Sequence, residues 1–252
     1  MVKKIWITGA SSGIGEALAK KFARNGWQVA ASARRENLLQ DLNKYNSNIK
    51  PFPLDVTDSD QTIQVFENII KKLENIDICV FCAGIHDPQS EKKLNVESIR
   101  RIMETNFFGT LNSIHAVNNY FKEKRSGHIS IVSSVAAYRG FPSASGYCAS
   151  KSALTSLAES LYFDFKRYNV RVSVVSPGFI KTPMTDQNNF PMPMIKLPKF
   201  AADQIFKGLI KKNSFEIHFP KLFTYFMKTL QILPNWLFFK IVGNAHKKTF
   251  KH

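Results

Sequence analysis

A tyrosine and a lysine stand four residues apart in the segment that runs from Tyr147 to Lys151. If this segment is helical, the two side chains lie on one face of the helix, where residues four apart are neighbours. A free tyrosine keeps its proton up to a pKa of about 10, and a nearby ammonium group lowers that pKa because it favours the phenolate. Such a phenol can exchange a proton with a substrate oxygen near neutral pH. Ser134, thirteen positions before Tyr147, carries a hydroxyl that could hold the same oxygen.

A tyrosine and a lysine also occur at this spacing by chance on many helix surfaces. Whether this pair is catalytic therefore depends on other features of the sequence. Gly9, Gly13 and Gly15 stand between an apolar stretch, Ile5 to Ile7, and a helical pattern that extends to Asn25. Glycines let a backbone turn tightly and approach a ligand closely, and the N-terminus of the following helix suits a pyrophosphate. The spacing differs from the ordinary Gly-x-Gly-x-x-Gly fingerprint. A tight connection without a ligand is the alternative, but the strand–turn–helix context favours nucleotide binding.

The end of the second expected strand indicates which nucleotide is bound. Folds that use NAD place an acidic residue there for the ribose hydroxyls, whereas this chain has Ala33 followed by Arg34 and Arg35. A guanidinium can hold a 2′-phosphate through two parallel hydrogen bonds, and an acidic residue would repel it. We therefore expect NADP(H) as the cofactor, with Arg34 as the main phosphate ligand. The alternative is a solvated arginine pair at the start of a helix.

Short apolar stretches alternate with longer helical patterns, which predicts βαβ units around a parallel sheet. We expect one α/β domain over residues 1–252, doubly wound, with about seven parallel strands and helices on both faces. The expected strands are residues 5–7, 27–32, 49–54, 76–82, 128–133, 171–175 and 215–218. Pro51 and Pro53 place the third of them at an edge of the sheet. Helical patterns cover residues 96–122 and 201–212 and extend from Tyr147 to about Tyr168.

Composition excludes several classes of protein. The three cysteines do not form a disulfide framework, and Cys79 and Cys82 point to opposite sides of an expected strand, so we expect no metal site. No secretory signal or apolar span of about 18 residues is present, which favours the cytoplasm. The net charge of +16 suits nucleic acid, anionic lipid or an anionic cofactor. No nucleic-acid-binding module is visible, and we expect no nucleic-acid partner.

In order along the chain, several motifs resemble those of the short-chain dehydrogenase/reductase family, over residues 5 to about 219. The loop from Thr8 to Gly15 reads TGASSGIG. Further matches are Asp55-Val56, Ala83-Gly84, Asn106, Ser134, Tyr147, Lys151, Pro177-Gly178 and Thr182. The resemblance implies a Rossmann-type domain and an NADP-dependent enzyme that acts on CH–OH and C=O groups. One motif departs from the family, because Phe81-Cys82 stands where two asparagines are usual, so we expect some loss of local rigidity but not of chemistry.

The resemblance also implies a role for each matching residue. Tyr147 is the general acid in reduction and the base in oxidation, Lys151 lowers its pKa and holds the nicotinamide ribose, and Ser134 positions the substrate oxygen. Asn106 supports a water that relays protons past Lys151. The cofactor-binding set implied by the resemblance and the arginine pair is Gly9, Ser11, Ser12, Gly13, Ile14, Gly15, Arg34, Arg35, Asp55, Val56, Ala83, Gly84, Tyr147, Lys151, Pro177, Gly178 and Thr182.

Two segments after residue 182 bear on the class of substrate and on the partners of the protein. Residues 183–200 are apolar and correspond to the substrate lid of the family, which suggests a hydrophobic carbonyl or alcohol, although these side chains could equally cover the core. Residues 221–252 form an apolar and basic helical extension in which no acidic residue follows Glu216. That composition is typical of an interfacial segment, which would place the protein peripherally at the inner membrane surface. A roof over the active site and a dimer contact are the alternatives.

These observations converge on an NADP(H)-dependent oxidoreductase that transfers a hydride between the nicotinamide and a hydrophobic carbonyl or secondary alcohol. The family resemblance also implies a homo-oligomer built through the helices that carry Asn106 and Tyr147. The alternative function is a catalytically silent NADP-binding regulator. The presence of Asn106, Ser134, Tyr147 and Lys151 together argues against it, because a silent relative has no need of the set.

Overall fold

Parallel strands form one seven-stranded sheet in the order β3-β2-β1-β4-β5-β6-β7 in the computed structural model, which describes residues 2–211 and 214–249. The strands are β1 (Lys4–Thr8), β2 (Gln28–Ala33), β3 (Ile49–Pro53), β4 (Ile78–Phe81), β5 (Gly127–Val132), β6 (Val170–Pro177) and β7 (Glu216–Phe219). The doubly wound fold is confirmed, and β3 with its two prolines lies at an edge as predicted. Because the strand order reverses between β1 and β4, a crevice opens there at the carboxyl ends of the strands.

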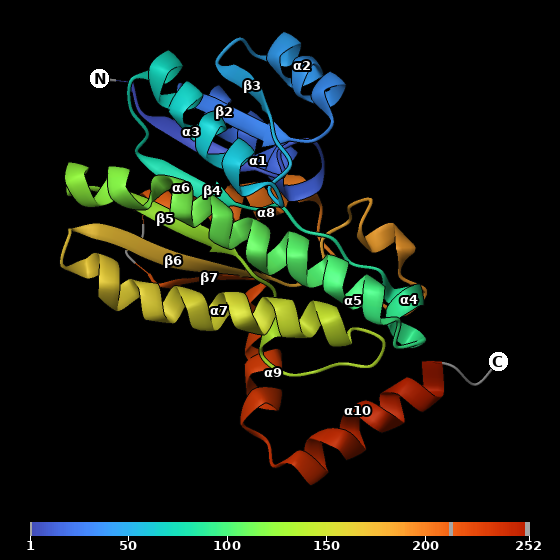
Figure 1. Ribbon diagram of the computed structural model, residues 1–252. Helices are drawn as coiled ribbons and strands as arrows, with labels where there is room; N and C mark the ends of the chain where they lie inside the picture. The colour runs from blue at the N-terminus through green and yellow to red at the C-terminus, as the bar shows by residue number, and fades with distance from the viewer. Residues whose placement is uncertain (1, 212–213, 250–252) are drawn as a thin grey trace.

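Helices cover both faces of this sheet (Figure 1). The α-helices are α1 (Gly13–Arg24), α2 (Glu36–Tyr45), α3 (Ser59–Leu73), α4 (Pro88–Lys92), α5 (Val96–Met103), α6 (Gly109–Lys124), α7 (Ser145–Lys166), α8 (Pro198–Lys211), α9 (Lys221–Ile232) and α10 (Asn235–Thr249). Short turns of other helix types are η1 (Glu104–Phe108), η2 (Val135–Ala137) and η3 (Thr185–Gln187).

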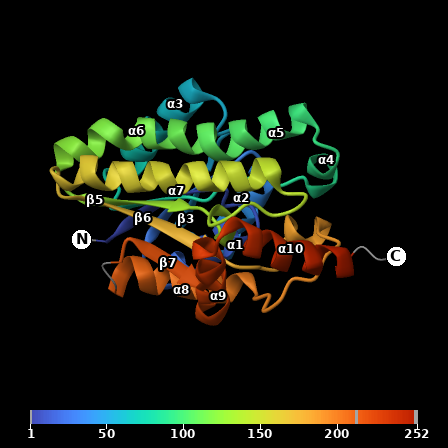
Figure 2. The same cartoon turned by 90° about the horizontal axis from the view of Figure 1, so that it is seen from below.

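Two hydrophobic cores lie on the two faces of the sheet. Side chains alternate along a strand, and on β1 Ile5 and Ile7 enter the core under α1, α2 and α8, whereas Trp6 enters the core under α3, α6 and α7. Viewed from below, α7 lies beside α5 and α6 on one side of the sheet, and α8 lies on the other (Figure 2). The sheet is thus buried on both sides, as expected for parallel strands.

The helical pattern predicted over residues 96–122 is interrupted by a π-helical turn, η1. This turn separates α5 from α6 and contains Asn106, which is fully buried. The hydroxyl of Thr110 donates to the carbonyl oxygen of Asn106 at 2.8 Å. Single π-helical turns are frequent at functional sites, and this one turns the Asn106 side chain toward the crevice side of α7.

The C-terminal extension forms two helices, as predicted. Figure 1 shows α9 leaving the end of β7 and α10 crossing beneath the body of the protein. A third hydrophobic core joins them to the domain. Its buried members are Val135, Tyr138, Phe223, Met227, Leu230 and Phe238. Part of the extension is therefore packed against the segment that follows β5.

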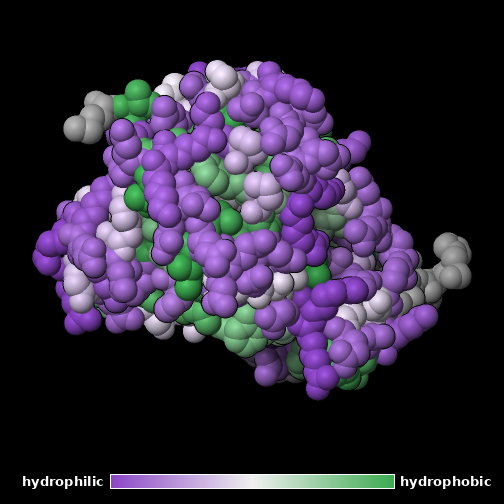
Figure 3. Space-filling view, turned by 45° about the horizontal axis from the view of Figure 1, so that its top comes forward, coloured by the Kyte–Doolittle hydropathy of each residue, from purple (hydrophilic) through white to green (hydrophobic). Residues whose placement is uncertain are grey.

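The face in Figure 3 is mostly hydrophilic, with hydrophobic residues gathered toward its middle. Across the described ranges, none of the helices combines the length and the apolar character that crossing a bilayer requires.

Candidate active site

The glycine loop joins β1 to α1 at the crevice between β1 and β4. Gly9 adopts a φ of +68°, and a Cβ there would lie 2.8 Å from backbone atoms of Ala83. The hydroxyl of Thr8 accepts hydrogen bonds from the backbone N–H groups of Cys82 at 3.1 Å and Ala83 at 3.4 Å. Only glycine allows the loop to approach the chain after β4 this closely, so two of the matching motifs lie against each other.

The N-terminus of α1 is open toward the crevice. Ser12 is the N-cap residue, but its side chain makes no capping hydrogen bond. Its hydroxyl instead accepts a hydrogen bond from Arg35 at 2.9 Å. The first N–H groups of a helix have no partners within the helix, and together with the helix dipole they suit a phosphate.

The two arginines after β2 meet different partners. Arg35 donates to the hydroxyl of Ser11 through two nitrogens, at 2.9 and 3.2 Å, as well as to Ser12. Arg34 is 67% exposed, and its nitrogen lies 3.8 Å from a carboxylate oxygen of Asp55. The structure therefore brings the Arg35 guanidinium to the glycine loop, whereas the Arg34 guanidinium lies exposed beside Asp55.

Asp55 and Val56 follow β3 on the same side of the crevice. Asp55 accepts hydrogen bonds from the N–H and the hydroxyl of Thr57, at 3.1 and 2.8 Å. The carbonyl oxygen of Val56 accepts a hydrogen bond from the Asn112 amide at 3.0 Å. These bonds fix the backbone turn where the adenine contact is predicted.

Ser134, Tyr147 and Lys151 come together at the carboxyl end of β5. Ser134 follows β5 and is hydrogen-bonded to the Tyr147 side chain, which projects from the first turn of α7. Lys151 lies one helical turn further on, with its nitrogen 5.7 Å from the centroid of the Tyr147 ring. That nitrogen donates a hydrogen bond to the carbonyl oxygen of Val132 at 2.9 Å. The predicted spacing thus brings the three side chains together, with Lys151 buried and Ser134 and Tyr147 partly buried.

Burial controls the charge states of this group. It raises the pKa of Tyr147 to about 12, although the hydrogen bond with Ser134 acts in the opposite direction. Burial also lowers the pKa of Lys151 to about 8. The resemblance implied that Lys151 lowers the pKa of Tyr147. In this structure desolvation of the phenolate raises that pKa, and the lysine nitrogen is directed at the Val132 carbonyl.

Asn106 ties the chain after β4 to α7. Its amide nitrogen donates to the Ile85 carbonyl oxygen and to the Ser150 hydroxyl, both at 3.0 Å, and its side-chain oxygen accepts from the Ile85 N–H at 2.7 Å. A Cβ at Gly84 would lie 3.2 Å from that oxygen. The backbone next to Ala83-Gly84 is therefore held by Asn106, while Phe81 and Cys82 occupy the positions of the usual asparagines.

The segment after β6 closes the crevice from the other side. The Gly178 N–H donates to the carbonyl oxygen of Phe219 at 2.7 Å, which sets the path of the chain beyond Pro177. Thr182 reaches the glycine loop, because a Cβ at Gly13 would lie 3.0 Å from the Thr182 methyl group. The predicted nicotinamide segment thus lies directly over the predicted pyrophosphate loop.

A cavity of about 510 Å³ adjoins this group, with Ser134 and Tyr147 in its wall. Its lining is mostly apolar and includes Met184 and Phe190 of the loop 183–200. The C-terminal helices also contribute Phe223, Phe226, Met227, Leu230, Ile241 and Val242. The extension therefore covers the candidate active site, one of the three roles considered from the sequence. The sequence analysis did not identify His86 or Phe141 in this wall, because neither belongs to a motif.

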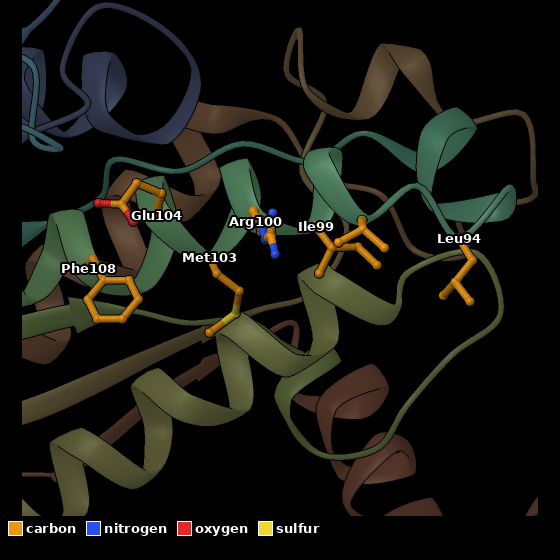
Figure 4. Close-up of a pocket in the computed structure, with 7 residues that line it drawn as sticks. Leu94, Ile99, Arg100, Met103, Glu104 and Phe108 are labelled. Atoms are coloured by element: carbon orange, nitrogen blue, oxygen red, sulfur yellow. The ribbon is translucent and has the colours of Figure 1, made fainter.

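A second hollow lies away from this chemistry, on the outer face of α5 and η1. Figure 4 shows Leu94, Ile99, Met103 and Phe108 along it. It has about the same volume, 500 Å³, but contains none of the predicted site residues.

Comparison with known proteins gives matches over most of the chain. A family model described as short chain dehydrogenase matches residues 3–192. An uncharacterized oxidoreductase of Myxococcus xanthus is 35% identical over 236 residues, covering 92% of this chain and 93% of that protein. The 3-ketodihydrosphingosine reductase of Mus musculus is 34% identical over 226 residues, covering 82% and 68% respectively.

A solved structure gives the same match in three dimensions. The short chain dehydrogenase from Burkholderia cenocepacia, crystallised in complex with NADP, superposes with a TM-score of 0.83 at 25% identity. The superposition covers 96% of this chain and 97% of that one, so it includes most of the C-terminal extension.

Proposed function

The chain belongs to the short chain dehydrogenase family, and we propose that it is an NADP(H)-dependent oxidoreductase that interconverts a hydrophobic ketone or aldehyde and the corresponding alcohol. The observation that carries this proposal is that Ser134 and Tyr147 line an apolar cavity while the buried Lys151 lies one helical turn from Tyr147. A hydroxyl pair and an ammonium group beside apolar surface suit proton transfer to an oxygen of an otherwise hydrophobic molecule.

The residues of the crevice fit NADP(H). The uncapped N-terminus of α1 would hold the pyrophosphate, and Arg34 and Arg35 would hold the 2′-phosphate. Gly9 and Gly13 let the loop pass close to Ala83 and Thr182, so that the motifs expected to contact the cofactor lie together. When bound, the nicotinamide supplies the hydride in reduction and accepts it in oxidation.

Three side chains carry the proton chemistry of this proposal. Ser134 and Tyr147 hold the carbonyl oxygen, and Tyr147 donates its proton to that oxygen as the carbonyl is reduced. The raised pKa keeps Tyr147 protonated at neutral pH, which a proton donor requires. Lys151, with a pKa of about 8, is mostly protonated at pH 7 and favours the phenolate that remains.

The apolar lining of the cavity supports a hydrophobic substrate. Residues 183–200 act as the lid in this proposal, and α9 and α10 form the opposite wall. The mouse relative is named as a reductase of 3-ketodihydrosphingosine, a name that agrees with a carbonyl group as the reacting centre.

Replacing Tyr147 by phenylalanine tests the function directly. Tyr147→Phe keeps the ring but removes the proton donor, so NADPH-dependent reduction of the hydrophobic probes nonanal and benzil should fall by about a hundred- to ten-thousandfold. NADPH binding, followed by fluorescence titration, should change less than about twofold, because the ring and backbone remain. Tyr162→Phe, on the exposed side of the same helix, is the matched control and should keep full turnover.

Substantial turnover in Tyr147→Phe would contradict the assignment. A wild-type protein that binds NADPH but reduces neither probe would instead favour the alternative function, a silent NADP-binding regulator.

We also propose that the outer face of α9 and α10 contacts an anionic membrane surface. Side chains that are more than half exposed there are Leu222, Tyr225, Phe226, Ile232, Trp236 and Phe239. Residues 217–252 contain lysines and no acidic residue, which gives the charge that an anionic lipid surface attracts. Phe226 also lines the cavity, so this face adjoins the place where a hydrophobic substrate would enter.

A further inference from the structure

The segment from His86 to Glu91 contacts Tyr147 through two polar side chains. A carboxylate oxygen of Glu91 accepts a hydrogen bond from the Tyr147 backbone N–H at 3.1 Å. The His86 ring packs against the Tyr147 ring, with 4.5 Å between centroids and 37° between planes. The Nε2 atom of His86 lies 3.3 Å from the other carboxylate oxygen of Glu91. The backbone and the ring of one residue are thus held by two side chains that also face each other.

The beginning of α7 shows why Glu91 matters. The first N–H groups of a helix need acceptors from outside the helix, but the N-cap residue Ala144 has no side-chain acceptor and the first turn contains no acidic residue. The Cys148 N–H already reaches the Ala144 carbonyl oxygen at 2.7 Å. The Tyr147 N–H, one residue earlier, is bonded to Glu91 instead, and a carboxylate at this end of a helix is also favoured by the helix dipole.

Burying the polar side chains of His86 and Glu91 costs desolvation free energy. The side chain of Glu91 is 0% exposed and that of His86 is 9% exposed. Among the side chains that the structure describes, neither His86 Nε2 nor the facing Glu91 oxygen has a hydrogen-bond partner of good geometry. An apolar side chain would fill the position of Glu91 without the cost of desolvating a carboxylate. The value of the carboxylate therefore lies in the contacts that it makes.

The short helix that carries Glu91 is anchored independently of Tyr147. Asp87 caps α4 through the Ser90 N–H at 3.2 Å, and its second oxygen accepts from the Ser98 hydroxyl and from Arg101, both at 3.0 Å. Because Ser98 and Arg101 belong to α5, Glu91 approaches α7 from a fixed support.

We propose that Glu91 and His86 are positioning residues for Tyr147, an inference that rests on the proposed function. Glu91 fixes the backbone at the first turn of α7, and His86 fixes the plane of the phenol ring, so that the hydroxyl stays beside Ser134. Displacement of a reacting group by about 1 Å can cost on the order of a hundredfold in rate. Loss of either contact should therefore lower turnover.

Substitutions at Glu91 separate position from packing. Glu91→Leu keeps the volume but loses the acceptor for the Tyr147 N–H, and kcat with nonanal and NADPH should fall about ten- to a hundredfold. Glu91→Gln keeps an oxygen acceptor and should restore kcat to within about threefold of wild type. His86→Ala should lower kcat about tenfold, because it frees the ring but leaves the backbone bond. KM for nonanal should stay within about threefold in the two Glu91 variants, because Glu91 does not line the cavity. The Kd for NADPH should stay within about threefold in all three variants, and Glu97→Leu, on the exposed face of α5, is the control.

Hydrogen exchange of the Tyr147 amide gives a readout that does not depend on turnover. The amide should exchange faster in Glu91→Leu than in the wild type and at the wild-type rate in Glu91→Gln. Unchanged kcat and unchanged exchange in Glu91→Leu would overturn the proposal, as would a rise in Kd for NADPH that matches the loss of kcat. If the wild type reduces neither nonanal nor benzil, the proposed function fails, and the exchange rates alone still decide whether Glu91 holds Tyr147.

Discussion

At the scale of residues, the adjacent Arg34 and Arg35 have different partners. Arg34 lies beside Asp55, and Arg35 donates hydrogen bonds to Ser11 and Ser12. If both arginines hold the 2′-phosphate, replacing either by alanine should weaken NADPH binding, since hydrogen bonds to a charged group contribute about 1.5–3 kcal/mol each. We expect each single variant to raise the Kd for NADPH at least about tenfold at 1.4 kcal/mol per decade. The double variant should lose the preference over NADH. Fluorescence titration with both nucleotides measures these constants.

The control for this prediction is Arg100→Ala, because Arg100 is exposed on α5 and far along the chain from the glycine loop. It should leave both dissociation constants unchanged. Equal binding of NADPH and NADH by the wild-type protein would mean that Arg35 only supports Ser11 and Ser12 and that Arg34 is a surface charge beside Asp55.

Sequence alone could predict Ser134, Tyr147 and Lys151 as a group, because helical spacing and the motif order determine which side chains meet. It could not predict the direction of the Tyr147 pKa, which depends on how completely neighbouring elements exclude water. His86 and Glu91 were missed for a related reason. Both His86 and Glu91 lie more than fifty positions before Tyr147 in the sequence. No local pattern predicts a contact over that separation.

At the scale of elements, β7 and α9 are joined through a half-buried carboxylate. Glu216 on β7 accepts hydrogen bonds from the Tyr138 hydroxyl and from Lys228 on α9. Burial acts to raise the pKa of Glu216, but the hydrogen bonds from Lys228 and Tyr138 outweigh it, so the pKa lies below the ordinary value of 4.5. Glu216→Gln should lower the free energy of unfolding by about 1–3 kcal/mol at pH 7, as measured by urea denaturation.

The pH dependence of this effect follows from the lowered pKa. The stabilisation by Glu216 is fully present above the unfolded-state pKa of about 4.3 and is lost as the pH falls through the lower folded-state pKa. The difference between wild type and Glu216→Gln should therefore shrink progressively below about pH 4. Glu97→Gln, which changes an exposed carboxylate, should shift the unfolding free energy by less than about 0.5 kcal/mol. If the difference in unfolding free energy between the wild type and Glu216→Gln instead grew as the pH fell, the stabilising role of the ionised Glu216 would be contradicted.

The elements themselves were mostly predictable, because apolar stretches and helical periodicity reflect which faces are buried. The prolines of β3 correctly indicated an edge strand. The exception is η1, where residues 104–108 have an ordinary helical composition. Their backbone is nevertheless π-helical, with hydrogen bonds between residues five apart instead of four. Such a turn is stabilised by the tertiary bonds of Asn106 with Ile85 and Ser150, which a single segment of sequence does not contain.

At the scale of the whole molecule, the outer face of α5, η1 and α7 is the surface that we expect to join copies of this chain. Phe163 is 72% exposed on α7, and Phe108 is 44% exposed at the hollow in Figure 4. Burying two such rings favours association by about 1.5–3 kcal/mol each. The double variant Phe108→Glu with Phe163→Glu should lower the molar mass in light scattering from that of an oligomer to that of a monomer. A wild-type monomer would contradict the prediction.

The outer face of α9 and α10 leads to the last prediction, which concerns a membrane rather than a second copy. The wild-type protein should sediment with vesicles that contain phosphatidylglycerol, and less with phosphatidylcholine alone or at high salt, because each lysine near an anionic surface contributes about 1 kcal/mol that salt screens. Deleting residues 221–252 is too coarse a test by itself, since Phe223, Met227 and Leu230 belong to a buried core. Trp236→Asn with Phe239→Asn changes only exposed side chains and should release the protein from the vesicles.

The control for vesicle binding is Phe163→Asn, which removes an equally exposed ring from a different face. If it binds vesicles like the wild type, the loss in the Trp236 and Phe239 variant is specific to the C-terminal helices. Phe226 lines the cavity and is also exposed, so membrane binding should lower the KM of the wild-type protein for a ketone carried in the vesicles. For nonanal added in solution, the variant with Trp236→Asn and Phe239→Asn should have the same KM as the wild type. A wild-type protein that remains in the supernatant with anionic vesicles at low salt would rule out the membrane contact and leave α9 and α10 as walls of the cavity alone.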